Sequence, residues 1–106
     1  MTEQIPAAIQ SFVDATNAAD TEAFLACFTD DAYLNDWGRE FHGHSGVASW
    51  NQSDNIGKQS HFEVVSVAER GDEVVVTMEV SGNGYNGTGP LAFTLDGELI
   101  KRLVIS

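Results

Sequence analysis

The chain has one cysteine, two prolines and five lysines and arginines, and these scarcities exclude several classes of protein. Cys27 stands alone, so no disulfide can form within the chain, and its apolar neighbours predict a buried, structural thiol. The 16 Asp and Glu residues leave a formal charge of -11, which repels phosphate backbones and anionic lipid surfaces. We therefore expect neither nucleic acid nor a membrane surface among the partners.

Long apolar runs and signal-like segments are also missing. No stretch approaches the roughly 18 apolar residues that a membrane-spanning helix requires, and residues 1–4 do not resemble the start of a secretory signal. The expectation is a cytoplasmic protein with no membrane segment. No glycine-rich dinucleotide fingerprint occurs, so no cofactor is expected. With 106 residues, 42% of them hydrophobic, the chain can build one core, and residues 1–106 are predicted to form a single domain.

The first half of the chain carries the spacing of short amphipathic helices. Apolar residues recur at helical intervals over residues 6–16, which begin with a proline that suits a first helical position. A second helix is predicted over residues 20–28, capped by its leading aspartate. A strand follows over residues 33–37 with a short partner over 40–43, and Ser45 is expected to cap a third helix.

From His61 onward the apolar period changes to two, which predicts four successive strands. Turn sequences at residues 70–72, 81–90 and 96–97 join these strands as antiparallel hairpins. Because the helices precede the strand meander, the chain is predicted to be an α+β domain. Its curved antiparallel sheet is expected to form a cone around the N-terminal helices, in the order α-α-β-α-β-β-β-β.

The predicted strands carry apolar residues on both faces of the sheet. In the last strand Leu99, Leu103 and Ile105 are assigned to the inner face. The outer face is assigned a mixed set of residues: Val65, Val67, Val75, Thr77, Thr94, Ile100, Arg102 and Val104. Such a face suits a partner, so we predict a symmetric homodimer through the outer sheet face. The alternative is an ordinary exposed face that is half apolar.

Four segments match the pattern of one known superfamily. Residues 9–20 resemble its first helix and turn, and Phe28–Ala32 resembles the F-x-x-D-A entry to its first strand. Residues 41–50 resemble the start of its third helix, and Leu95–Ile100 resembles its final D-G-x-I hairpin. The chain thus resembles the nuclear transport factor 2-like superfamily, and within it the small bacterial SnoaL-like proteins. This fold hosts isomerases, dehydratases, epoxide hydrolases, polyketide cyclases and non-catalytic modules, so it does not give the function by itself.

The resemblance implies a cone with an apolar pocket, in which one or two carboxylates perform acid/base chemistry on a small apolar ligand. Asp36 falls where the ketosteroid-isomerase branch keeps its general base, and a carboxylate that loses hydration in an apolar pocket accepts protons more readily. The oxyanion donors of that branch are missing, because Phe12 and Leu91 stand in their places. The alternative for Asp36 is a hydrogen bond to its own turn backbone.

Two other arrangements are not expected. The Asp-Arg-Asp arrangement of the epoxide-hydrolase branch is missing, because Arg39 lies in a predicted turn and Arg70 at a hairpin tip. His42 and His44, with His61 and Asp36, have the donor types of a zinc site, but their spacing is weak evidence for one. We predict no metal site.

The remaining candidates complete the predicted pocket. His61 opens a strand and is a candidate proton shuttle for Asp36, the alternative being a solvated strand-end histidine. Tyr85 lies in a glycine-rich loop that can act as a lid. The predicted substrate-binding residues are Phe12, Trp50, Met78, Val80, Tyr85 and Phe93. The prediction is a pocket for a small apolar molecule, with acid/base catalysis of the isomerase, cyclase or dehydratase type. The alternative is a non-catalytic ligand-binding or dimerisation module, so enzyme activity is left open.

Overall fold

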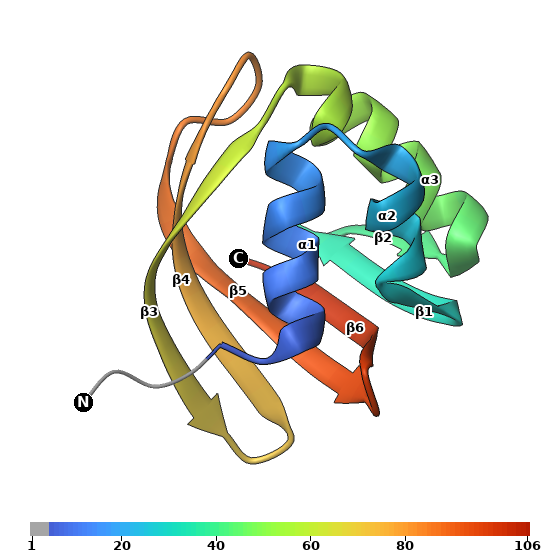
Figure 1. Cartoon of the computed structure of the whole chain (residues 1–106), viewed down its shortest axis with the longest axis vertical. Helices are drawn as coiled ribbons and strands as arrows, with labels where there is room; N and C mark the ends of the chain where they lie inside the picture. The colour runs from blue at the N-terminus through green and yellow to red at the C-terminus, as the bar shows by residue number, and fades with distance from the viewer. Residues whose placement is uncertain (1–4) are drawn as a thin grey trace.

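The computed structural model describes residues 5–106 and shows a curved sheet with helices on its concave side (Figure 1). In chain order the elements are α1 (Ala7–Asn17), α2 (Thr21–Ala26), β1 (Phe28–Asp36), β2 (Arg39–His42), α3 (Gly43–Asp54), η1 (Ile56–Lys58), β3 (His61–Arg70), β4 (Glu73–Ser81), β5 (Gly87–Asp96) and β6 (Leu99–Ile105). No helix in this part of the chain is long and apolar enough to cross a membrane. The expectation drawn from residues 1–4 lies outside the described residues.

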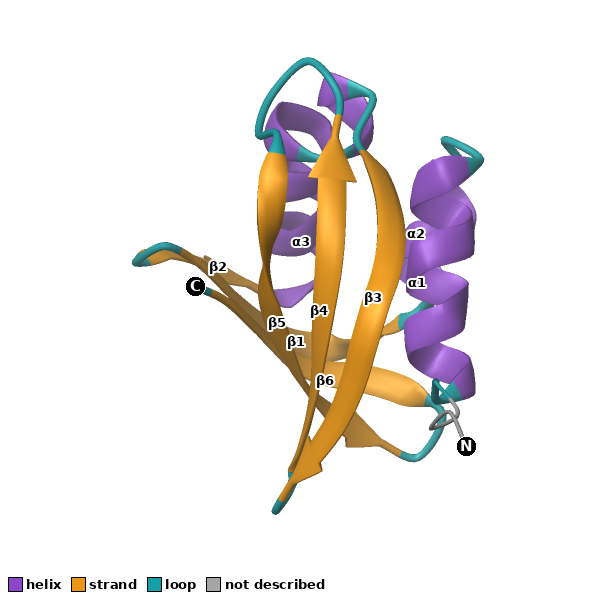
Figure 2. Ribbon diagram, turned by 90° about the vertical axis from the view of Figure 1, so that its left-hand side faces the viewer, coloured by secondary structure: helices purple, strands orange, loops and turns teal. Residues whose placement is uncertain are grey.

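The strands of the described chain form one open sheet in the order β2-β1-β6-β5-β4-β3 (Figure 2). Strands β3 to β6 follow one another through antiparallel hairpins, as predicted. Strand β6 then lies parallel to β1, so the sheet is mixed and not wholly antiparallel. A parallel pairing between strands far apart in the chain has no turn signature, so the sequence pattern could not reveal it. The predicted α+β class and the element order are confirmed.

Two helix starts show how local chemistry sets the element boundaries. Asp20 caps α2, as predicted, because its Oδ1 accepts a hydrogen bond from the Ala23 backbone N–H at 3.1 Å. Helix α3 begins at Gly43, ahead of the predicted cap Ser45. Gly43 has a φ of 70°, a conformation that favours glycine and lets the chain pass from β2 into α3 without a loop. The helix therefore packs directly against the β1–β2 pair.

The core is centred on one aromatic cluster. The Phe12 ring of α1 is fully buried and lies 5.3 Å from Phe24, 6.1 Å from Phe28, 5.4 Å from Phe62 and 5.3 Å from Phe93, measured between ring centroids. Tilted, edge and stacked contacts of this kind each add about 0.5–1.5 kcal/mol to the gain from burial. The cluster joins α1 and α2 to three strands, so it holds the helices on the concave face.

Two bulges shift the alternation of the strands. Val65 has no partner in the β3–β4 register, and Lys101 has none in the β5–β6 register. Across each bulge the inward positions move by one residue. Val67 packs on the core and Ile100 is fully buried, whereas Leu99 is exposed. The assignment of these three residues to faces was therefore wrong. The outer face keeps Val65, Val75, Thr77, Thr94, Arg102 and Val104, all exposed or half-buried.

Candidate functional site

A pocket of about 410 Å³ lies beside the C-terminal half of α3. Its other walls come from the β1–β2 turn, η1, the start of β3, the β4–β5 hairpin and the end of β6. Trp50, Phe62 and Leu91 are its most buried apolar lining residues, and most of its surface is apolar. A mainly apolar concavity with a few convergent polar groups is the usual form of a small-molecule site.

Asp36, the last residue of β1, lies in the pocket wall with its side chain 15% exposed. Two donors converge on its Oδ2 atom: the Trp50 indole N–H at 2.9 Å and an Arg39 guanidinium N–H at 2.7 Å. Its Oδ1 atom accepts no hydrogen bond from residues 5–106. The adjacent turn is bonded instead by Asn35, whose Oδ1 accepts from the Gly38 backbone N–H at 2.8 Å. One Asp36 oxygen is therefore fixed, while the other has no hydrogen-bond partner within the described chain.

Arg39 connects Asp36 to a second carboxylate, Asp54 on α3. Its Nη2 atom lies 2.7 Å from Asp36 Oδ2 and 3.1 Å from Asp54 Oδ1. An Asp-Arg-Asp contact does form, contrary to the sequence-based expectation. The reason is that Asp36 and Arg39 face each other across the β1–β2 hairpin, so the turn that holds Arg39 also directs it toward α3. Both carboxylates of this contact line the pocket.

The charge state of Asp54 follows from its neighbours. Burial alone would raise the pKa of its carboxyl group. Hydrogen bonds from Ser53 and Arg39, together with the positive charges of Arg39 and Lys58, outweigh burial and lower the pKa below its usual range. Asp54 is therefore ionised at neutral pH. It balances the charge of Arg39 and is a poor proton donor.

A buried polar cluster that the sequence analysis did not name also borders the pocket. Asn55 is 1% exposed, and its Nδ2 donates to Thr16 Oγ1 and Asn51 Oδ1, each at 3.0 Å. Its Oδ1 has no hydrogen-bond partner within the described chain. The cluster ties the end of α3 to α1 and so steadies this wall of the pocket. The available signal was two asparagines four residues apart at the end of a helical segment.

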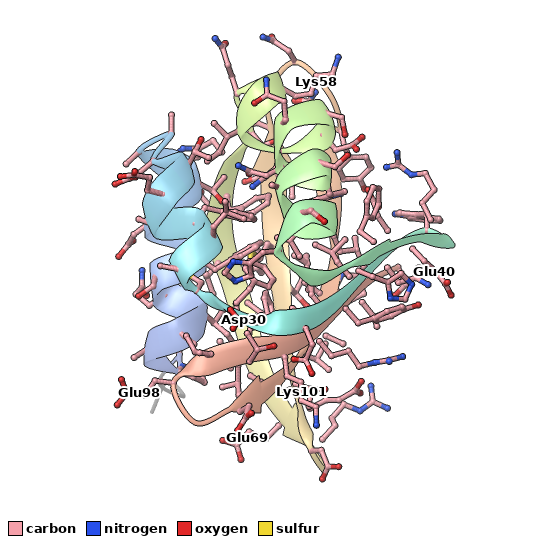
Figure 3. The ribbon with its side chains drawn as sticks, turned by 90° about the vertical axis from the view of Figure 1, so that its right-hand side faces the viewer. Asp30, Glu40, Lys58, Glu69, Glu98 and Lys101 are labelled. Carbon is pink, nitrogen blue, oxygen red and sulfur yellow. The ribbon has the colours of Figure 1, made fainter. Side chains whose placement is uncertain are left out.

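The edge of the pocket carries exposed aromatic side chains from two separate turns. Trp37, in the β1–β2 turn, is 70% exposed, and Tyr85, in the β4–β5 loop, is 53% exposed. The β4–β5 loop is docked on the segment after α3, because the Asn83 backbone N–H donates to the Lys58 carbonyl at 2.8 Å. Figure 3 shows the Lys58 side chain pointing outward at this end of the molecule.

The predicted site residues separate into three groups in the structure. Four line the pocket: Asp36, Trp50, Val80 and Tyr85. Three do not line it and are fully buried in the core: Phe12, Met78 and Phe93. His61 is an exposed residue at the start of β3, outside the pocket lining. The lining residues Arg39, Asp54 and Trp37 were missed. Trp37 and Arg39 belong to a tight hairpin turn, and a Trp-Gly pair is a weaker hairpin signal than Asn-Gly.

The histidines near α3 have local partners. His44 Nε2 lies 2.9 Å from the Phe28 carbonyl oxygen, and His42 Nε2 lies 3.7 Å from Glu40 Oε1. In Figure 3 Glu40 lies on the β1–β2 hairpin, at the edge of the molecule. Within residues 5–106 no three His, Cys, Asp or Glu side chains are grouped to hold a metal ion.

Solved structures with this fold include several relatives of the chain. A candidate polyketide cyclase from Sinorhizobium meliloti is 26% identical, with a TM-score of 0.84, and the match covers 96% of this chain and 95% of that one. A Mycobacterium tuberculosis protein in complex with estradiol-17β-hemisuccinate is 19% identical, with a TM-score of 0.80 and coverage of 96% and 93%. The Δ5-3-ketosteroid isomerase from Mycobacterium sp. is 18% identical, with a TM-score of 0.78 and coverage of 94% and 89%.

The family assignment rests on nearly the whole chain. No functionally curated protein matches it. The pattern of the SnoaL-like domain, however, matches residues 9–103, from the first turns of α1 to the middle of β6. The resemblance seen in the sequence is thereby confirmed, and the chain belongs to the SnoaL-like domain family of the nuclear transport factor 2-like superfamily.

Proposed function

We propose that this domain binds a small, largely apolar molecule in the pocket beside α3, with Asp36 as a general base. The observation that carries the proposal is the difference between the two Asp36 oxygens. Oδ2 is held by Trp50 and Arg39, while Oδ1 has no hydrogen bond from residues 5–106. A general base needs a fixed position and an acceptor atom within reach of the substrate proton, and this geometry supports both.

The supported chemistry is proton abstraction from carbon next to a carbonyl group. Asp36 Oδ1 takes the proton, and the electron pair moves to the carbonyl oxygen, which must then be stabilised by donors. Phe12 and Leu91 cannot donate. Tyr85 is a lining residue whose hydroxyl is not engaged by any hydrogen bond within the described chain. It is the candidate for stabilising the oxyanion in an isomerase, cyclase or dehydratase reaction.

Hydrolysis of an epoxide is less well supported, even though Arg39 joins two carboxylates. Opening an epoxide requires an acid that protonates the leaving oxygen as water attacks. Asp54 is the obvious candidate, but the lowered pKa of its carboxyl group keeps it ionised at neutral pH. The Asp36–Arg39–Asp54 contact therefore favours a role in positioning Asp36.

The second candidate function is non-catalytic ligand binding. Of the related structures, one holds a steroid ester and another is a ketosteroid isomerase, so proteins of this fold include both ligand complexes and an enzyme. This supports an apolar ligand for the present chain and is compatible with binding alone or with catalysis. The missing oxyanion donors at Phe12 and Leu91 favour this second candidate.

We further propose that the outer sheet face forms a homodimer, as expected from the sequence. Val65 is 60% exposed at the centre of a bulge, and Val75 on β4 and Val104 on β6 are half-buried on the same face. Light scattering should give the mass of a dimer, and Val65→Lys should lower it to that of the monomer. A monomeric mass for the unchanged chain would refute this proposal.

The test of the function uses α-tetralone, a fused-ring ketone with exchangeable protons next to its carbonyl. Calorimetry measures its binding, and NMR in deuterated water measures exchange of those protons. We expect binding and accelerated exchange, and we expect Asp36→Asn to slow the exchange by roughly 10²- to 10⁴-fold. The matched control is Asp30→Asn, because Asp30 lies on the same strand with a fully exposed side chain.

The outcomes separate the candidates. Binding without accelerated exchange would leave the non-catalytic module. An equal loss of exchange in Asp30→Asn and Asp36→Asn would mean that net charge, and not the pocket carboxylate, matters. No binding of α-tetralone, of estradiol or of other steroids would overturn the proposal as a whole.

A further inference from the structure

The β1–β2 turn holds a residue in an unfavourable conformation. Asp36 and Arg39 pair across the two strands, so Trp37 and Gly38 are the two central residues of the turn. Their φ angles are 55° and 94°, a combination that Asn-Gly satisfies best. A bulky side chain is rare at positive φ because its Cβ crowds the backbone. The chain therefore carries a local conformational cost at Trp37.

The Trp37 backbone N–H donates to the Ile105 carbonyl at 3.1 Å, but the side chain offsets none of this cost. The Trp37 side chain is 70% exposed, and its indole neither donates a hydrogen bond nor contacts another aromatic ring among residues 5–106. The ring nevertheless lines the pocket. Strained backbone conformations are concentrated at functional sites. A ligand in the pocket would supply the missing contact.

Tyr85 provides a second ring at the same pocket from a different element. Its hydroxyl lies 2.6 Å from where a Cβ would stand on Gly87, so this glycine makes room for the ring. Among residues 5–106, the exposed large hydrophobic residues are two aromatic ones, Trp37 and Tyr85, and three aliphatic ones in the strands. Both aromatic residues line the pocket, and none of the aliphatic ones does.

We propose that Trp37 and Tyr85 recognise the rings of the ligand, and that the ligand is a planar, fused-ring molecule. The proposal rests on the proposed function, since it assumes that the pocket binds a small apolar molecule. Flat rings stack on or meet the edges of aromatic side chains, and such contacts add to the gain from apolar burial. Trp37 determines specificity in this view, while Asp36 performs any chemistry.

The experiment compares two probes of equal skeleton, planar β-naphthol and its saturated, puckered analogue decahydro-β-naphthol. Binding is followed by the indole N–H signals in NMR, which are two because Trp37 and Trp50 are the only tryptophans. We expect the unchanged protein to bind β-naphthol roughly three- to tenfold more tightly, as a ring contact predicts. The Trp37 signal should shift on binding.

The key variant is Trp37→Asn, which places Asn-Gly in the turn. It should raise the melting temperature because the strain is relieved, and it should abolish the preference for β-naphthol. A residue with a purely structural role would lose stability instead. The control is Ala19→Asn: Ala19 has nearly the same φ, 56°, but lies between α1 and α2 outside the pocket. It should also stabilise the fold while leaving both affinities unchanged.

Each result decides a separate question. If the unchanged protein binds both probes equally, or if Trp37→Asn keeps the preference, the role of Trp37 is refuted while the proposed pocket stands. If neither probe binds, and the steroid panel also fails, the pocket itself is refuted. A Trp37 signal that shifts with protein concentration and not with β-naphthol would assign the ring to contact between copies of the chain, and would refute the proposal.

Discussion

The concave face of the sheet is used differently by α1 and by α3. Against α1 it is filled: Phe12 alone packs beside four other phenylalanine rings, and it does not line the pocket. Against the C-terminal half of α3 it stays open as a pocket of about 410 Å³. The strands present apolar residues to both helices. What differs is the helix, because α1 buries Ile9, Phe12 and Val13, whereas α3 buries only Val47 and Trp50 among its large apolar residues.

This difference shows how one sheet can provide both stability and a site. The last turns of α3 and the residues after it carry Ser53, Asp54 and Asn55, which form hydrogen bonds and cannot fill apolar space. Close packing on one side can hold the fold while a gap persists on the other. Substitutions on the filled side and on the open side test this division.

Truncation at the centre of the filled side should have the largest effect. Phe12→Ala removes a fully buried ring and should lower the free energy of unfolding by about 3–5 kcal/mol, measured by urea denaturation. A matched pair sharpens the comparison: Val76→Ala in the core should cost about 2 kcal/mol, and Val80→Ala in the pocket wall should cost clearly less. Equal costs for the two valines would contradict the difference drawn here.

Trp50 belongs to both the filled region and the pocket, since its ring stacks against Phe24 and also lines the pocket. Trp50→Phe keeps an aromatic ring but removes the indole N–H that Asp36 accepts. A hydrogen bond to a charged group contributes about 1.5–3 kcal/mol, so we expect a loss of that order in the free energy of unfolding. In the Asp36→Asn background, Trp50→Phe should lower the free energy of unfolding by less, and a double-mutant cycle would measure the difference. Full additivity would mean that the bond contributes nothing.

The ion pair at the pocket edge should contribute less, and in a pH-dependent way. Because the folded-state pKa of Asp54 lies below its ordinary value of 3.8, the ionised group stabilises the fold above that pH. This contribution is lost as the pH falls through the folded-state pKa. Arg39 is 55% exposed, so solvent weakens the pair, and Asp54→Asn should cost less than about 1 kcal/mol at neutral pH. The difference should shrink in denaturation experiments well below pH 3.8; a difference that grows with acidity would contradict this account.

The smallest effect concerns reactivity. Burial raises the pKa of the Cys27 thiol to about 11, and its Sγ donates to the Ala23 carbonyl at 3.3 Å. At pH 8 very little thiolate is present, so a thiol reagent such as DTNB should modify the folded protein far more slowly than the unfolded chain. Equal rates in buffer and in denaturant would show that Cys27 is exposed.

Local patterns were sufficient for the fold class but not for the faces of every strand. The alternation of apolar residues and the hairpin turns predicted β3 to β6 correctly, and Asp20 was correctly placed as the cap of α2. The faces of Val67 and Ile100 were wrong, because an unpaired residue beside each of them shifts the alternation: Val65 before Val67, and Lys101 after Ile100. A bulge is decided by the fit between two strands, so a single strand does not reveal it.

The same limit applies to the candidate site. The sequence singled out Asp36 and Trp50, but not the hydrogen bond between them, and it placed Phe12 and Phe93 in a pocket that they do not line. Arg39 looked like a turn residue. Only the two-residue hairpin, which sets Arg39 opposite Asp36, brings it within reach of Asp54.

The sequence by itself determined the α+β class, the order of elements, the family and an acidic surface with few basic groups, because each depends on composition or on short-range spacing. The tertiary structure decided the parallel β1–β6 pair, the two bulges, the filled and open sides of the sheet, and the contact of Asp36 with Trp50 and Arg39. These features join residues far apart in the chain. Their energies depend on how surfaces fit together, and no local pattern carries that information.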